Sequence, residues 1–318
     1  MNLILGDSSY DISDAASALI NGNLVAFPTE TVYGLGASAT NSIAVKRIFS
    51  VKERPISHPL IVHISSVEMI ETWSGTVPEY VFKLAQDFWP GPLTVILNRS
   101  EIAGELITGG SKSVGIRVPG HPIAIKLLKK FESLGGLGIA APSANRFGAV
   151  SATAACDVLE EIGHLLSEND RVIDGGRCEI GIESTILDCT GKNPYILRLG
   201  AVTETMILKS LNIKKLAKSP SSNQSHPGSL EKHYQPKAKV VLNVQPLEGD
   251  GFIAMEGIKT PDGVFRLFSP SNLNLFAKGL YSSFREADKM NLKRIVVIVP
   301  EGGDFALAIK ERLIKASS

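Results

Sequence analysis

The sequence predicts a mixed α/β protein with two domains, and three observations lead to this prediction. Short apolar runs rich in Val and Ile alternate with segments of helical periodicity along most of the 318 residues. Strand-like runs also follow one another directly near residues 172–199, so we expect part of the first sheet to be antiparallel. A stretch rich in Lys, Ser and Pro follows residue 212, and the alternation restarts beyond it, which indicates a second folding unit.

Strands in the N-terminal part are expected where apolar and β-branched residues dominate a short run. In chain order these runs are residues 24–27, 59–64, 93–97, 114–118, 137–141, 184–188 and 195–199. Helices are expected where apolar residues recur every three or four positions. These segments are residues 11–22, 42–53, 78–89, 121–131 and 153–166. Pro122 falls in the first turn of its helix, where a missing backbone N–H is tolerated.

The C-terminal part repeats the alternation on a smaller scale. Its expected strands are residues 240–244, 251–256, 263–268 and 294–299, and its expected helices are residues 271–290 and 305–315. This pattern is typical of a small Rossmann-like α/β domain. We therefore predict a first domain at residues 1–212, a linker at 213–237 and a second domain at 238–318.

Composition excludes several classes of protein. A hydrophobic content of 44% with 20% charged residues predicts a globular chain with a sizeable core. The formal net charge of +1 argues against a globally basic nucleic-acid binder. Three cysteines without a CxxC pair give no disulfide framework and no zinc motif, which favours a reducing, cytoplasmic setting. Without an apolar run of about eighteen residues, no membrane span is expected.

Common catalytic motifs give little guidance. The chain lacks a P-loop, an HExxH motif and a GxSxG motif, and GLGASA at residues 34–39 is a weak match to a dinucleotide fingerprint. Polar side chains instead gather where predicted strands end. They are Thr29, Glu30, Thr31, Lys52, Arg54, His63, Arg117, Ser143, Asn145, Ser184 and Arg198. Cations and hydroxyl groups at strand ends predict an anion pocket suited to phosphate or carboxylate, so a nucleotide together with a small acid would fit.

Several segments together resemble a known family. FPTETVYGLGA, KERPISHPLIVHI, WPGPLTVIL, VGIRVPGHP, APSANRFGAVSAT, GIESTILD and ILRLG are similar to the successive motifs of the YrdC-like threonylcarbamoyl-AMP synthases, in the family's order, over residues 1 to about 205. The connector HPGSLEKHYQP with the extra C-terminal domain resembles the two-domain branch of that family. The resemblance implies that the first domain is a YrdC-like catalytic domain built on a twisted open mixed sheet.

The resemblance also implies a reaction. L-threonine, bicarbonate or carbon dioxide, and ATP with Mg²⁺ would give threonylcarbamoyl-AMP and pyrophosphate by nucleotidyl transfer. No covalent protein nucleophile and no metal ligand from a protein side chain are implied. The product would pass to downstream proteins that transfer the threonylcarbamoyl group to tRNA, next to the anticodon.

Site residues follow from the family's motifs. The resemblance implies that threonine is held by Thr31, His63, Arg117, Ala141 and Ser184, with Arg117 facing the carboxylate. It implies that ATP is held by Lys52, Arg54, His58, Ser113, Ser143, Asn145, Ser151, Arg198 and Tyr234. Gly34 and Gly36 would let the backbone approach closely, and the linker would act as a lid.

The chain departs from the family's pattern at three of these positions or their neighbours. His58 stands where the family often has Asn, and His226 and Ser229 stand where Ser and Met are usual.

Simpler interpretations exist for each residue alone. His63 would more often be a core histidine, and Ser143 and Asn145 could serve a turn. A rival function is binding of double-stranded RNA or tRNA, favoured by the lysines of residues 126–130 but not by the neutral composition. A second rival is a nucleotide-binding regulator without turnover.

Overall fold

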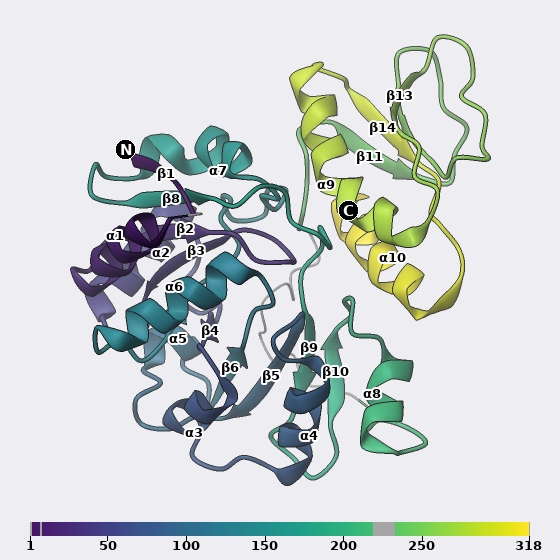
Figure 1. Ribbon diagram of the computed structural model, residues 1–318. Coiled ribbons are helices and arrows are strands. Elements are labelled where there is room, and N and C mark those ends of the chain that lie inside the picture. Colours follow the sequence, from purple (N-terminus) through teal and green to yellow (C-terminus); the bar gives the residue numbers. More distant parts are fainter. Residues whose placement is uncertain (1, 7, 219–232, 318) are drawn as a thin grey trace.

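The computed structural model describes residues 2–6, 8–218 and 233–317, and Figure 1 shows two sheets joined through packed helices. The larger sheet has ten described strands, in the spatial order β1-β8-β2-β3-β7-β4-β6-β5-β9-β10. In chain order these are β1 (Asn2–Leu5), β2 (Val25–Phe27), β3 (Gly34–Ser38), β4 (Ile61–His63), β5 (Leu93–Asn98), β6 (Ser113–Arg117), β7 (Ile139–Ala140), β8 (Arg171–Asp174), β9 (Thr185–Asp188) and β10 (Tyr195–Arg198).

Both pairing directions occur in this sheet. Strands β4 and β6 are parallel, whereas β3 and β7, and β5 and β6, are antiparallel. The helices around the sheet are α1 (Ser9–Ile20), α2 (Ser42–Lys52), α3 (Ile70–Trp73), α4 (Glu79–Phe88), α5 (Glu105–Thr108), α6 (Pro122–Ser133), α7 (Ala155–Ile162) and α8 (Glu204–Leu211), with 3₁₀ turns at Val67–Met69 and Gly163–Leu165. The predicted mixed α/β class is confirmed.

Helices cover the sheet on both faces, so its central strands are buried, whereas the edge strands β1 and β10 are partly exposed. Phe27 of β2 packs with α1 and α6 in one apolar cluster, whereas its neighbour Ala26 belongs to the cluster that includes α2, α4 and α7. Successive strand residues point to opposite faces, and each face here has its own helical layer. A polar side chain therefore reaches a ligand only where a strand ends.

Three strands lack a predicted range of their own: β1, β3 and β8, the last of which begins the stretch 172–199 where consecutive strands were expected. Strand β1 is short, and β3 has the sequence GLGAS, whose glycines have low strand propensity. Packing explains Gly36: a Cβ atom there would lie 2.6 Å from the Ile139 side chain and 2.9 Å from the Phe27 ring. The glycine at this position therefore makes room for neighbouring protein side chains.

The C-terminal part forms a four-stranded parallel sheet. Its strands, in spatial order, are β11 (Lys239–Leu242), β14 (Arg294–Val297), β12 (Gly251–Ile253) and β13 (Phe265–Phe268). Helices α9 (Leu273–Lys289) and α10 (Gly303–Ser317) lie between this sheet and the N-terminal part (Figure 1). The predicted Rossmann-like α/β unit agrees with this parallel sheet, while the domain bounds 1–212, 213–237 and 238–318 remain a prediction.

The two parts share an apolar core. Val32, Val150 and Ile182 of the N-terminal part cluster with Phe276 of α9 and Ile309 of α10. Burial of such side chains contributes roughly 1.5–3 kcal/mol each. Because the cluster is continuous, the C-terminal part packs directly against the N-terminal part through a shared core.

One glycine allows the two parts to approach this closely. Gly181 has φ +83°, and a Cβ atom there would lie 2.5 Å from the Cα atom of Lys278 in α9. Any larger residue would push α9 away.

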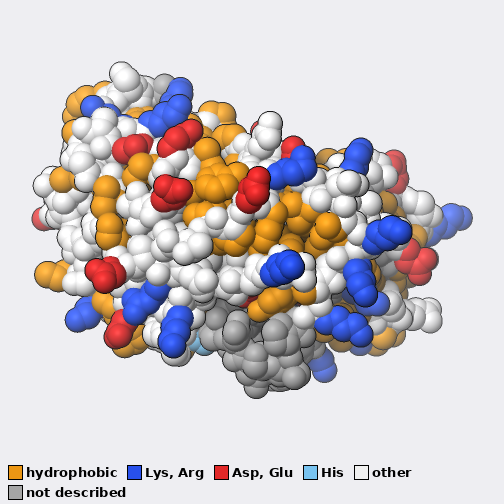
Figure 2. All heavy atoms as spheres, turned by 90° about the horizontal axis from the view of Figure 1, so that it is seen from below, with side chains coloured by type: hydrophobic (Ala, Val, Ile, Leu, Met, Phe, Trp, Pro, Cys, Tyr) orange, Lys and Arg blue, Asp and Glu red, His pale blue; other side chains and the backbone are white. Residues whose placement is uncertain are grey.

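The surface offers few further clues to function. Figure 2 shows hydrophobic side chains gathered in the middle of one face, with Lys, Arg, Asp and Glu side chains around them. Within the described part of the chain, no helix combines the length and the apolar character needed to cross a bilayer.

Candidate functional site

A pocket with a cavity volume of about 60 Å³, which continues into space open to solvent, lies where several strands of the large sheet end. The pocket is lined by residues of the strand ends, of the loops that follow them and of the linker: Thr29, Thr31, Val32, Tyr33, Gly34, Arg54, Pro59, Leu60, Ile61, His63, Arg117, Ala141, Pro142, Ser143, Glu183, Ser184, Arg198, His233 and Tyr234.

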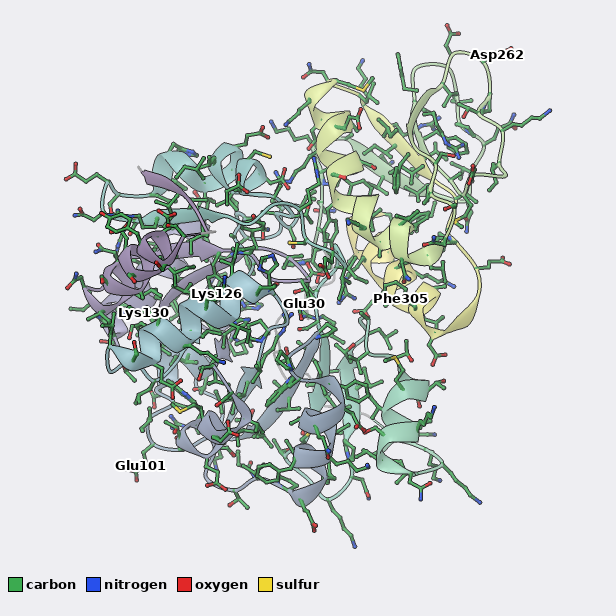
Figure 3. All side chains as sticks on the ribbon, in the orientation of Figure 1. Glu30, Glu101, Lys126, Lys130, Asp262 and Phe305 are labelled. Carbon is green, nitrogen blue, oxygen red and sulfur yellow. The ribbon has the colours of Figure 1, made fainter. Side chains whose placement is uncertain are left out.

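Arg117, the last residue of β6, organises one end of the pocket. Its guanidinium forms a 2.7 Å ion pair with Glu30 and donates to the Thr31 hydroxyl at 3.0 Å and to the Gly91 carbonyl at 3.1 Å. Glu30 also accepts from the Gly120 backbone N–H at 2.9 Å, and Figure 3 labels it near the middle of the molecule, beside the beginning of α6. The Thr-Glu-Thr segment therefore fixes the arginine in place.

The Thr29 hydroxyl completes this segment. It lies 2.8 Å from the Thr31 hydroxyl and donates to the Val32 carbonyl at 2.6 Å. These bonds fold the chain sharply after β2 and turn Thr31 toward Arg117.

His63, the last residue of β4, lies beside Arg117 in the sheet and is almost fully buried. Burial and the nearby Arg117 cation lower the pKa of His63 to about 3, despite the neighbouring carbonyls of Ile61 and Ile139. Its Nδ1 atom has no well-aligned hydrogen bond to any described group. A buried polar atom without a partner indicates a ligand, so a neutral imidazole is available to bind one.

Arg198, the last residue of β10, and Ser184 form the opposite wall. Arg198 donates to the Ser184 carbonyl at 3.0 Å and to its hydroxyl at 3.1 Å, and the same hydroxyl lies 2.8 Å from that of Thr94. Arg54 follows α2, donates to the Pro59 carbonyl at 2.9 Å and lies over the Phe147 ring. Burial and the nearby Arg198 cation lower the pKa of Arg54 to about 10, and at neutral pH it is a cation. Two arginines thus give this wall its positive charge.

The threonine-binding residues predicted from the sequence all line this pocket, as do four of the predicted ATP-binding residues. The four are Arg54, Ser143, Arg198 and Tyr234. The structure places the others outside the lining: Lys52, His58, Ser113, Asn145 and Ser151. Their roles in binding ATP stay a prediction, and each has a protein environment of its own.

Lys52 is one of the predicted ATP-binding residues that contact protein groups and do not line the pocket. Its ammonium group is fully buried and donates to the carbonyls of Ser143, at 2.6 Å, and of Asn145. Burial, followed by repulsion from Arg54, lowers its pKa. In this geometry Lys52 holds the loop that carries Ser143, so it shapes the pocket from behind.

Ser113, Asn145 and Ser151 also lie outside the pocket lining, Ser113 because of its place in the strand and the other two because they bond to protein groups. Ser113 begins β6 while Arg117 ends it, which separates them by roughly 13 Å along the strand. The Asn145 side chain donates to the Arg146 and Ala149 carbonyls, both at 2.8 Å. Ser151 donates to Glu183 at 2.6 Å.

A row of rings reaches the pocket on the linker side. His58, Phe147, His233 and Tyr234 make successive edge contacts, and the ring centroids of His233 and Tyr234 are 4.0 Å apart. Of these four, His233 and Tyr234 line the pocket. Tyr234 is fully buried, and its hydroxyl has no hydrogen-bond partner among the described residues. Linker residues 219–232, including His226 and Ser229, lie outside the described part of the chain. Of the linker predicted at residues 213–237, the structure therefore describes 213–218 and 233–237, and its action as a lid stays a prediction.

Sequence reasoning missed Glu183 as a lining residue, although it lies in the quoted motif GIESTILD. Burial opposes its ionisation, but the Arg312 and Arg198 cations and the hydrogen bond from Ser151 together lower its pKa to about 2. A buried carboxylate in a pocket that binds anions needs a neighbouring cation to balance its charge. Arg312 of α10 supplies that cation, and α10 carries none of the motifs that pointed to the site.

The neutral His63 predicts a dependence of stability on pH. The unfolded histidine binds a proton near pH 6.5 and the folded one only near pH 3, so its contribution is complete above pH 6.5 and is lost as the pH falls toward 3. Between about pH 7 and about pH 5, the wild type should lose about 2 kcal/mol more unfolding free energy than His63→Gln. Urea denaturation at both pH values measures this; equal losses in the two proteins would show that His63 is not held neutral.

Comparisons with known proteins agree with this geometry. A family model described as telomere recombination (Sua5, YciO and YrdC) matches residues 17–200, and one described as threonylcarbamoyl-AMP synthase, C-terminal domain, matches residues 202–318. A threonylcarbamoyl-AMP synthase of Pyrococcus abyssi is 38% identical, over 97% of this chain and 94% of the relative. One of Bacillus subtilis is 35% identical, over 98% and 94%. A crystal structure of P. abyssi Sua5 complexed with L-threonine has a TM-score of 0.89 at 36% identity, covering 100% of this chain and 98% of that one.

Proposed function

Since the chain belongs to the Sua5/YrdC family of threonylcarbamoyl-AMP synthases, we propose that this pocket joins L-threonine, bicarbonate or carbon dioxide, and ATP into threonylcarbamoyl-AMP. The observation that carries the proposal is the lining itself. Arg54, Arg117 and Arg198 supply cations, while His63 supplies a neutral, buried imidazole. A carboxylate and a triphosphate need this combination.

The threonine half of the site uses the Arg117 end. Arg117 has five N–H donors, and its contacts to Glu30, Thr31 and Gly91 leave some of them for the substrate carboxylate. His63 is beside it and free to pair with the substrate's hydroxyl group. The Ala141 backbone segment and the Ser184 hydroxyl complete the wall.

The chemistry requires no protein nucleophile. The threonine amine takes up carbon dioxide and loses a proton, giving a carbamate whose oxygen attacks the α-phosphorus of ATP. The bond from that phosphorus to the bridging oxygen breaks, and pyrophosphate leaves with the electron pair. Arg54 and Arg198 would stabilise the charge on the phosphates, and the closed pocket would hold the reactants together away from water.

Magnesium would enter as part of the ATP substrate. The carboxylates at the pocket, Glu30 and Glu183, are already engaged, one by Arg117 and the other by Arg312. They do not form an open ligand set for a resident metal ion. The nucleotide phosphates themselves supply the oxygen ligands that Mg²⁺ prefers.

His63 predicts a preference for threonine over valine. Valine has nearly the same shape but would leave the imidazole unpaired, which costs about 1–3 kcal/mol, or a factor of about five to about 150. In His63→Ala that preference should shrink. Adenylate formed from each amino acid can be compared by chromatography, and a ratio unchanged by the substitution would remove His63 from hydroxyl recognition.

The proposed function is tested by asking whether pyrophosphate release requires all three substrates together. Pyrophosphate release by the full chain should depend on ATP, threonine and bicarbonate together. Binding of ATP with no release would instead favour the nucleotide-binding regulator, and release without threonine would contradict the proposed synthase reaction. Tight binding of double-stranded RNA or tRNA without turnover would favour the RNA-binding alternative. The product would supply proteins that complete threonylcarbamoyladenosine in tRNA.

A further inference from the structure

A buried network joins the C-terminal domain to the pocket. The Glu183 carboxylate accepts hydrogen bonds from Arg312 Nε of α10 at 2.9 Å, from the Tyr281 hydroxyl of α9 at 3.0 Å and from the Ser151 hydroxyl at 2.6 Å. Arg312 is fully buried, and Glu183 and Tyr281 are nearly or fully so. The cation that pairs with Glu183, a residue of the pocket lining, thus comes from the C-terminal domain.

Arg312 contacts both chain segments of one pocket wall. Besides Glu183, it donates to the Leu199 carbonyl at 2.8 Å. Glu183 directly precedes Ser184, and Leu199 directly follows Arg198. Ser184 and Arg198 line the pocket and are hydrogen-bonded to each other. Arg312 therefore fixes the two backbones that carry this pair.

Charge gives Arg312 a second effect. Glu183 is ionised and lies close enough to Arg198 for each to shift the other's protonation. With Arg312 present, the carboxylate is already paired with a cation and therefore attracts Arg198 less. Without Arg312, Arg198 would be the nearest remaining cation, and Glu183 would draw it away from the ligand.

We propose that Arg312, assisted by Tyr281, is a positioning residue that the C-terminal domain supplies to the substrate pocket, holding Glu183 so that Ser184 and Arg198 face the ligand. This proposal rests on the proposed function for the identity of the ligands. It gives the C-terminal domain an indirect part in substrate binding, through the residues of the pocket wall that Arg312 holds.

The structure provides a matched control in the same interface. Arg285 of α9 is also buried and also reaches across to the N-terminal domain, where it donates to the Val150 carbonyl at 2.5 Å and to Glu161 at 3.1 Å. It touches neither Ser184 nor Arg198. Loss of Arg285 should therefore weaken domain docking without changing the pocket charge.

The test compares Arg312→Met, Arg285→Met and the double variant Arg312→Met/Glu183→Gln, all in the full chain. Binding of ATP and of threonine is measured by calorimetry, beside melting temperature and the kcat and KM of pyrophosphate release. Arg312→Met should weaken ATP binding at least tenfold. Arg285→Met should change it less than threefold, although both melt earlier. The double variant should regain most of the affinity, because the neutral amide that replaces the Glu183 carboxylate no longer captures Arg198.

Several outcomes would overturn the proposal. Equal losses of affinity in Arg312→Met and Arg285→Met, in proportion to their melting temperatures, would reduce Arg312 to a structural role. Failure of the double variant to recover would contradict the charge argument. If Arg312→Met does not fold, Tyr281→Phe decides: weaker ATP binding at an unchanged melting temperature supports positioning, and unchanged binding contradicts it. A wild type that binds ATP but makes no adenylate would refute the proposed function while leaving this binding test intact.

Discussion

Replacement of Arg117 by methionine is expected to abolish threonine-dependent turnover, by at least about a hundredfold, and to destabilise the fold. The substitution removes the cation for the substrate carboxylate and leaves Glu30 buried without its 2.7 Å partner. Breaking a buried ion pair from one side costs about 3–5 kcal/mol. Urea denaturation measures the loss of stability, and pyrophosphate release with threonine measures the loss of activity.

A double substitution separates these two effects. Arg117→Met/Glu30→Gln removes both charges, so most of the stability should return. Activity should not return, because no cation faces the threonine carboxylate. Turnover restored together with stability would mean that Arg117 only supports the fold.

Arg54→Ala is expected to lower kcat/KM for ATP by about ten- to a hundredfold with little change in threonine affinity. A charge-assisted hydrogen bond to phosphate contributes about 1.5–3 kcal/mol. The substitution also removes a hydrogen bond to the Pro59 carbonyl and a contact with the Phe147 ring, but it breaks no ion pair among the described residues and relieves repulsion from Arg198, so the protein should still fold. Steady-state kinetics at varied ATP, with calorimetry for threonine, measures both quantities.

Arg47→Ala serves as the control for Arg54→Ala. Arg47 lies on α2, the helix that Arg54 follows, and pairs with Asp170 at 2.6 Å. Its loss should affect stability but not ATP kinetics. Parental ATP kinetics in Arg54→Ala would remove Arg54 from the phosphate site.

Most of the strands could be predicted from the sequence because their own residues strongly favour β structure. Runs such as that around Ile61–His63 are apolar, β-branched and bounded by turn-forming residues. Strand β3 escaped prediction because its glycines are required by the neighbours Phe27 and Ile139, and those contacts exist only in the folded chain. Local propensity carries no information about such packing.

The candidate site shows the same division. Arg117, His63 and Ser184 stand at or beside strand ends, where a polar side chain next to an apolar run already suggests a role in binding. Lys52 also stands at the end of an element, but its ammonium group turns to the carbonyls behind the pocket. Arg312 could not be found this way, since it lies 129 residues from its partner Glu183 on an ordinary amphipathic helix.

Isotope tracing tests the central claim most directly. The full chain would be incubated with labelled bicarbonate, labelled threonine and ATP, and the products separated and weighed by mass spectrometry. We predict a single mixed anhydride of AMP that carries both labels, formed in step with pyrophosphate. An adenylate that carries the threonine label but not the bicarbonate label, or ADP and phosphate in place of pyrophosphate, would contradict threonylcarbamoyl-AMP synthesis in this pocket.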